Sequence, residues 1–200
     1  MVAPLPPLPY ALDALVPVMS AAQVDAHANH HLPTYHQKYT ALVTDLPISD
    51  KAIEWVLTNL DEVPAEKRVA ISRMGGGVVN HINFFENLAP LNKTGEPSAA
   101  LKQAIESQWG SMDKFMADFS AKIAAGWASS WTTLVEKDSK LELITLTGQE
   151  YPETFGYKTL CTIDAWEHAF YVDYQWKKAE YAEKVLTLIN WNTVNKRYGK

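Results

Sequence analysis

The sequence predicts an α+β fold, in which an N-terminal α-helical hairpin domain is followed by a C-terminal domain with a small three-stranded antiparallel sheet. Three observations support this prediction. Between residues 20 and 46, three- and four-residue spacings that indicate a helix relate Val24, His27, His31 and Tyr35. Segments 131–136 and 140–147 are rich in Thr, Val, Leu and Ile and flank a polar turn, which indicates a hairpin. After Asp164 the helical spacing returns.

The first half is expected to be helical. Residues 1 to about 19 form an extended, proline-rich lead-in, and Ser20 followed by Gln23 is a capping-box signal that opens the first helix. Pro33 lies inside this helix and predicts a kink near His31. Further helical segments are expected near 50–60, 64–73 and 78–88. The run MGGG at 74–77 predicts either a helix break or a close backbone approach.

The second half is expected to mix helices and strands. Residues 91–98, LNKTGEPS, form the predicted linker, so we expect a helical domain over 1–90 and an α+β domain over 91–200. Ser98 and Ser111 are suitable caps for helices over 98–108 and 111–124. A third strand is expected at 157–163, followed by helices over 166–178 and 180–190.

Composition and charge exclude several classes of protein. The chain of 200 residues is 47% hydrophobic and 20% charged, which is enough to bury a core. A net charge of −5 argues against general binding to nucleic acid or to an anionic membrane. There is no run of about 18 apolar residues that could span a membrane. The single Cys161 excludes an intrachain disulfide framework and a multi-cysteine zinc or iron–sulfur site.

The N-terminal segment predicts a cytoplasmic location. Its first basic side chain is Lys38, whereas a secretory signal needs a positive start and a mitochondrial presequence needs arginines. If Met1 was added to a processed mitochondrial chain, this prediction does not hold.

The histidines are the strongest candidates for chemistry. His27 and His31 lie four residues apart, so they share a helix face. His81 lies between apolar and aromatic residues in NHINFF, and Asp164 and His168 lie four apart where a strand becomes a helix. Three histidines and one aspartate suit a first-row metal. Four filled positions would make a closed zinc site, whereas a fifth position leaves room for solvent, and composition does not decide between them.

Several segments together resemble the iron/manganese superoxide dismutases, and the resemblance covers nearly the whole chain. It rests on the opening LPPLPYALDALVP, the spacing of His27, His31 and Tyr35, and the segments NHINFFENLAP, DAWEHAFYVDY and INWNTVNKRY. Gly126-Trp127 resembles the Gly-Trp pair of the family's pocket. The resemblance implies that superoxide is converted to oxygen and hydrogen peroxide at one metal ion per subunit.

The resemblance also implies roles for individual residues. The protein ligands are His27, His81, Asp164 and His168, with water or hydroxide in the fifth position. Because the metal must cycle between divalent and trivalent states, zinc does not serve. Tyr35 gates access near the solvent ligand, and His31 extends the proton relay. The remaining implied residues wall the cavity, namely Trp127 and Trp166, with Phe85 where the family usually has tryptophan.

One feature of the sequence, the position of a glutamine, bears on metal preference. Members of the family place a glutamine over the solvent ligand from one of two positions. Iron forms usually supply it one turn before the second ligand, where this chain has Gly77, and manganese forms supply it after the hairpin, where Gln149 stands. The resemblance therefore implies manganese, with iron as the alternative.

The chain departs from the family at several places that are not expected ligands. Ala28 and Leu32 stand where histidines are usual, and Pro33 is unexpected within its helix. Trp176 replaces a usual asparagine. Ser129-Ser130 resembles an insertion, which leaves the placement of Trp131 open.

The resemblance further implies a homodimer, with a tetramer as the alternative. Glu167 would cross the interface to His168 of the other copy, and Tyr171 would meet His31. Lys178, where the family usually has arginine, is the candidate for steering the superoxide anion toward the site of an acidic protein.

Two other classes of function remain open at this point. A non-haem iron oxygenase usually keeps two histidines and one carboxylate with several open positions, whereas a third histidine would fill one of them here. A metal-storage protein would have no use for Tyr35 or Gln149 at their positions. A dismutation assay without organic substrate and an analysis of the bound metal separate these classes.

Overall fold

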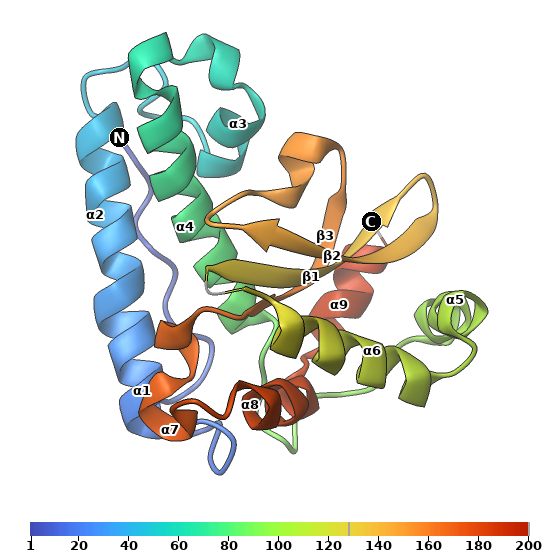
Figure 1. Cartoon of the computed structure of the whole chain (residues 1–200). Coiled ribbons are helices and arrows are strands. Elements are labelled where there is room, and N and C mark those ends of the chain that lie inside the picture. Colours follow the sequence, from blue (N-terminus) through green and yellow to red (C-terminus); the bar gives the residue numbers. More distant parts are fainter. Residues whose placement is uncertain (128, 200) are drawn as a thin grey trace.

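The computed structural model describes residues 1–127 and 129–199, and Figure 1 shows their arrangement. The helices of the first half are α1 (Ala21–Asp25), α2 (Leu32–Val43), α3 (Ile53–Thr58) and α4 (Arg68–Glu86). The second half holds α5 (Ala99–Trp109), α6 (Met112–Ala125), β1 (Ser130–Lys137), β2 (Lys140–Thr147), β3 (Lys158–Asp164), α7 (Tyr171–Tyr174), α8 (Lys178–Val185) and α9 (Trp191–Tyr198). The predicted α+β class is confirmed.

The first helical rod contains a π-helical turn. Ser20 caps it, because its hydroxyl accepts the backbone N–H of Gln23 at 3.1 Å. Between α1 and α2, residues Ala26–His31 form the π-helix, and the N–H of Leu32 bonds to the carbonyl of His27 five residues back. Pro33 follows after one intervening residue, Leu32. The irregularity predicted near His31 thus takes the form of a π turn, which widens the helix by one residue just before the proline.

Helix α4 lies beside α2 and completes a helical hairpin (Figure 1). It runs unbroken through Gly75, Gly76 and Gly77, so the predicted helix break is wrong and the alternative of a close approach is confirmed. The two segments predicted around the triglycine are therefore parts of one helix of 19 residues.

The sheet has the strand order β2-β1-β3, and both pairings are antiparallel. Asp138 and Ser139, which join β1 to β2, have φ of 50° and 60°, as in the tight turns of two-residue hairpins. The return strand β3 pairs with the other edge of β1, and its register places Asp164 opposite Trp131. The three strands predicted from the sequence are thus confirmed.

The segment after β3 is less helical than predicted. Instead of one helix over 166–178, it forms a 3-10 turn at Glu167–Ala169 and the short helix α7. Gln175, with a φ of 53°, ends α7 before α8 begins. The predicted helix over 180–190 begins earlier and ends earlier, as α8.

One continuous apolar core joins the two halves. It contains side chains from both, including Val24 and Phe84 from the first and Leu134, Ile163 and Tyr181 from the second. Because the halves share this core, residues far apart in the sequence are held at fixed positions near their junction. Within the ranges 1–127 and 129–199, no helix is long and apolar enough to cross a membrane.

Candidate metal centre

Four side chains meet where the two halves join. His27 lies in the π turn, His81 in α4, Asp164 at the end of β3 and His168 in the following 3-10 turn. Each offers one ligand atom, and these atoms lie within 4.8 Å of one another. His27, His81 and Asp164 are buried, and only His168 is partly exposed.

The geometry fits a metal ion. Three imidazole nitrogens surround one carboxylate oxygen, because the Oδ2 of Asp164 lies 3.3 Å from Nε2 of His27, 3.6 Å from that of His81 and 3.1 Å from that of His168. Donor atoms about 2.0–2.2 Å from a shared ion are separated from each other by about 3 to 3.5 Å. The four residues can therefore hold one ion without large movements.

Unused hydrogen-bonding capacity also points to a metal. Both ring nitrogens of His27 are buried and lack a hydrogen-bond partner among the described residues. Buried polar atoms are rarely left in this state, so a missing ligand is the natural partner. The Nδ1–H of His81 donates to the carbonyl of Gly77 at 2.5 Å. This bond leaves the lone pair on Nε2 facing the cluster.

The protonation states are those of metal ligands. Burial lowers the pKa of His27 and lowers that of His81 well below its usual value, so both rings are neutral. Burial alone would raise the pKa of Asp164, but the adjacent His168 and His27 outweigh it and hold this pKa well below its usual range. His27 and His81 thus offer neutral nitrogens, and Asp164 offers an anionic oxygen.

A hydrogen-bonded chain of three side chains lies beside the cluster. The Nε2 of Gln149 donates to the Tyr35 hydroxyl at 3.0 Å, and the indole N–H of Trp131 donates to Oε1 of Gln149 at 3.1 Å. Tyr35 and Trp131 both contact the ring of His81, with centroids at 5.3 and 4.9 Å. The structure thus brings the predicted Tyr35 and Gln149 together next to a predicted ligand.

His31 lies between this chain and the ligands. Its ring is 3.9 Å from that of His168 and 5.2 Å from that of Tyr35, measured between centroids. Its Nε2 is buried and has no partner among the described residues. Burial and the neighbouring His168 lower its pKa to about 4.

Of Trp127 and Trp131, it is Trp131 that packs against the centre, so the prediction that Trp127 walls it is wrong. Trp127 is 89% exposed, whereas Trp131 is fully buried against His81. Strand pairing fixes Trp131 opposite Asp164. The sequence carried a signal for this outcome, because Ser129-Ser130 already resembled an insertion.

Trp166 and Phe85, the other predicted wall residues, each lie beside a predicted ligand. The ring of Trp166 is 5.4 Å from that of His168, and the ring of Phe85 is 5.0 Å from that of His27. Gly77 has no room for a side chain in this structure, since an added Cβ would lie 2.5 Å from Cε1 of Tyr35. The Tyr35 ring therefore occupies the space that a glutamine at position 77 would need.

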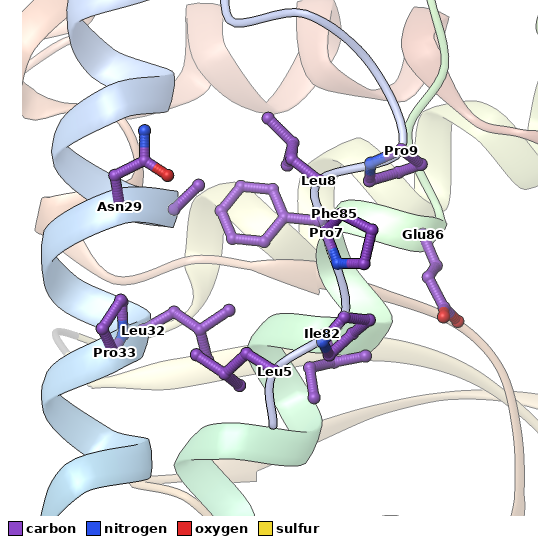
Figure 2. Close-up of a pocket in the computed structure, with 12 residues that line it drawn as sticks. Leu5, Pro7, Leu8, Pro9, Asn29, Leu32, Pro33, Ile82, Phe85 and Glu86 are labelled. Atoms are coloured by element: carbon purple, nitrogen blue, oxygen red, sulfur yellow. The ribbon is translucent and has the colours of Figure 1, made fainter. Parts of the chain in front are cut away.

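An apolar pocket of about 290 Å³ lies behind Phe85. Figure 2 shows that it is formed between the proline-rich lead-in, which contributes Leu5 and Pro7, and the first helical rod, which contributes Leu32. Ala28 also lines it. Two of the departures from the family pattern, Ala28 and Leu32, therefore face this pocket rather than the ligand cluster.

The remaining predicted residues are Lys178, Glu167 and Tyr171. Lys178 is half-buried, its Nζ donates to the carbonyl of Gly126 at 2.5 Å, and burial lowers its pKa. Glu167 is exposed, and Tyr171 is 50% exposed. The single chain thus presents Glu167 and Tyr171 to its surroundings, next to the ligand His168.

Comparisons with known proteins agree with this centre. Residues 4–89 match the alpha-hairpin domain of the iron/manganese superoxide dismutases, and residues 97–197 match their C-terminal domain. The chain is also 40% identical to "Superoxide dismutase [Mn]" of Listeria monocytogenes serovar 1/2a (strain ATCC BAA-679 / EGD-e) over 195 residues, which cover 97% of this chain and 96% of that protein. The chain therefore belongs to the iron/manganese superoxide dismutase family, and it is an oxidoreductase that acts on superoxide.

Proposed function

We propose that this superoxide dismutase works with manganese, one ion per subunit, held by His27, His81, Asp164 and His168. One observation carries the choice of metal. The glutamine beside the ligands comes from position 149, where it bonds to Tyr35, whereas position 77 has a glycine packed against the Tyr35 ring. The manganese in the printed name of the Listeria relative supports the same choice.

Metal analysis tests this proposal directly. Protein purified without added metal should contain manganese, and the metal-free chain should regain far more activity with manganese than with iron. An iron form that is much more active than the manganese form would contradict the proposed metal, although it would leave the dismutase activity in place.

The reaction joins two superoxide anions and two protons to give one oxygen and one hydrogen peroxide. A metal ion held by His27, His81, Asp164 and His168 would supply the one-electron redox chemistry that both halves of the reaction need. Asp164 offsets part of the positive charge at the site, and the bond from His81 Nδ1 to Gly77 fixes that ring.

The surrounding side chains handle the protons and exclude water. The Tyr35 oxygen accepts from Gln149, which leaves its own hydroxyl proton free to be donated toward the cluster. Burial raises the pKa of Tyr35, so this proton stays in place at neutral pH. The rings of Trp131, Trp166 and Phe85 pack around the histidines and keep the site dry.

We also propose that the chain divides near residue 90 into a helical domain over 1–90 and an α+β domain over 91–200. Two ligands come from each part, so the metal site lies between them. The matches to the family's two domains, over 4–89 and 97–197, support this division.

Lys178 is proposed to steer superoxide toward the site. The protein has a net charge of −5, and a cation lining the approach raises the association rate of an anion by about 10- to 1000-fold in favourable cases. Lys178→Glu is expected to lower kcat/KM and to weaken the fall in rate with rising salt. The matched control is Lys177→Glu, an exposed neighbour with the same change of charge. If both variants keep the wild-type rate and salt slope, Lys178 has no steering role.

A homodimer is proposed, in which Glu167 of one copy hydrogen-bonds His168 of the other and Tyr171 similarly meets His31. The exposure of Glu167 and Tyr171, close in sequence to the ligand His168, supports this arrangement. The same interface could recur within a tetramer.

The dimer proposal predicts that Glu167→Ala weakens association and lowers metal retention, because His168 loses the group that orients its ring. Sedimentation velocity at low protein concentration measures the first effect, and metal analysis measures the second. Glu183→Ala, which removes an exposed carboxylate from α8, serves as control. A Glu167→Ala variant that is as dimeric and metal-replete as the control would refute the cross-subunit contact.

A further inference from the structure

The triglycine in α4 is unusual because glycine weakens a helix, yet α4 continues through it without a break. Each of the three glycines meets a different neighbour. An added Cβ at Gly75 would meet only side chains, of which the nearest is Tyr39 at 3.0 Å. One at Gly77 would enter the Tyr35 ring, as described above.

Gly76 is different because it meets backbone. An added Cβ there would overlap the carbonyl oxygen of Gln149 and lie 3.1 Å from its carbonyl carbon. Flexible side chains can move aside, but a backbone carbonyl moves only with its whole segment. The absence of a side chain at position 76 therefore allows the segment after β2 to lie directly on α4.

Asn80 forms a hydrogen bond with Glu150, the next residue of the same segment. It is buried, and its Nδ2 donates to the carbonyl of Glu150 at 3.0 Å. Gly76 and Asn80 are four residues apart, so they lie on one face of α4. Two consecutive carbonyls, those of Gln149 and Glu150, thus dock on this face.

We propose that Gly76 and Asn80 are positioning residues that set how far the Gln149 amide reaches toward the metal centre. They touch neither metal nor substrate, and they act through Gln149. This inference rests on the proposed role of Gln149. Because that amide bonds to Tyr35 at 3.0 Å and to Trp131 at 3.1 Å, a shift of its backbone disturbs both bonds together.

The test compares Gly76→Ala with Gly75→Ala. Both add one methyl group to the same helix, but only the first displaces the Gln149 backbone. Gly76→Ala is expected to retain metal, to lose about 10-fold or more of the manganese-supported activity, and to shift the metal's reduction potential in the same direction as Gln149→Ala. Gly75→Ala should stay near wild type in potential. Equal potentials in the two variants would overturn the proposal.

Asn80→Ala supplies a second route to the same displacement without added bulk. It removes the bond to Glu150, so it should shift the potential in the same direction even if Gly76→Ala fails to fold. If Asn80→Ala keeps the wild-type potential, Asn80 does not position Gln149.

A double-mutant comparison shows whether the effect passes through Gln149. In the Gln149→Ala background, adding Gly76→Ala should change activity by less than about twofold. An effect as large as in the wild-type background would overturn the proposal. The activities of wild type and variants are also measured with iron. A wild-type enzyme that is more active with iron than with manganese would contradict the proposed metal, and this result is separate from the comparison of the variants.

A measurement without metal completes the test. In the nitrogen-15 spectrum of the full-length metal-free chain, the signal of the Gln149 side-chain amide is identified by its loss in Gln149→Ala. It should move in Gly76→Ala and Asn80→Ala and stay in place in Gly75→Ala. An unmoved signal in both of the first two variants would contradict the proposed positioning.

Discussion

Replacing Asp164 or His81 by alanine is expected to abolish dismutation and nearly all metal binding. Asp164 has the larger effect, because its Oδ2 is the one anionic oxygen among three imidazoles and its Oδ1 also accepts the backbone N–H of Trp166 at 2.9 Å. His81→Ala removes a ligand whose orientation α4 fixes through Gly77. Metal analysis and a dismutation assay on the reconstituted variants measure both effects.

The same variants are expected to melt at lower temperature. A ligand that binds only the folded state stabilises it by about 2.7 kcal/mol when its free concentration is 100 times its dissociation constant. Wild type with and without metal should therefore differ in melting temperature, whereas the Asp164→Ala variant should not respond to added metal.

Matched controls come from the surface. His30 and Asp25 form an exposed pair with 3.5 Å between Nε2 and Oδ2, outside the cluster. His30→Ala and Asp25→Ala remove the same side-chain types and should keep metal and activity. Full metal content and activity in Asp164→Ala or His81→Ala would refute the ligand assignment.

Gln149→Ala is expected to keep the metal and to lose about 10- to 100-fold in manganese-supported activity, as is typical when a group that orients a metal site is removed. The variant leaves Tyr35 without its donor and the buried indole N–H of Trp131 without its acceptor. Activity per bound metal measures the first consequence. An unpartnered buried donor costs about 1–3 kcal/mol, so the midpoint of chemical denaturation should also fall.

Gln103→Ala, an exposed change in α5, provides the control and should match wild type in both measurements. A Gln149→Ala variant with wild-type activity per metal would show that the Gln149 amide has no role in the reaction.

Moving the glutamine to position 77 should not rescue this variant. From the sequence alone, Gly77→Gln combined with Gln149→Ala would be expected to restore some activity and to shift preference toward iron. The structure argues against this exchange, because the Tyr35 ring fills the space next to Gly77. The double variant should therefore stay as inactive as Gln149→Ala alone.

The sequence predicted the elements whose signals are local. Helical spacing identified the first rod, the polar turn at Asp138 and Ser139 identified the hairpin, and Asp164 with His168 showed the spacing of paired ligands. These predictions succeeded because i, i+4 neighbours and two-residue turns follow from backbone geometry alone.

Predictions from local spacing were wrong or incomplete where the backbone departs from a regular helix. One helix was predicted over 166–178, but the positive φ of Gln175 ends α7 after four residues. The π turn before Pro33 was predicted only as an irregularity, because a proline requires some departure from the α-helix without specifying which one.

Only the tertiary structure decided which tryptophan walls the metal centre and what the triglycine does. Trp127 and Trp131 are four positions apart in the sequence, and neither has a local pattern that distinguishes it. The pairing of Trp131 with Asp164 across two strands made the choice. The proposed role of Gly76 likewise depends on its contact with the backbone of Gln149, which is 73 residues further along the chain. The sequence by itself determined which residues could bind the metal, since ligand chemistry belongs to the side chains. The positions of the residues around these ligands depend on packing between distant segments, which local sequence spacing does not predict.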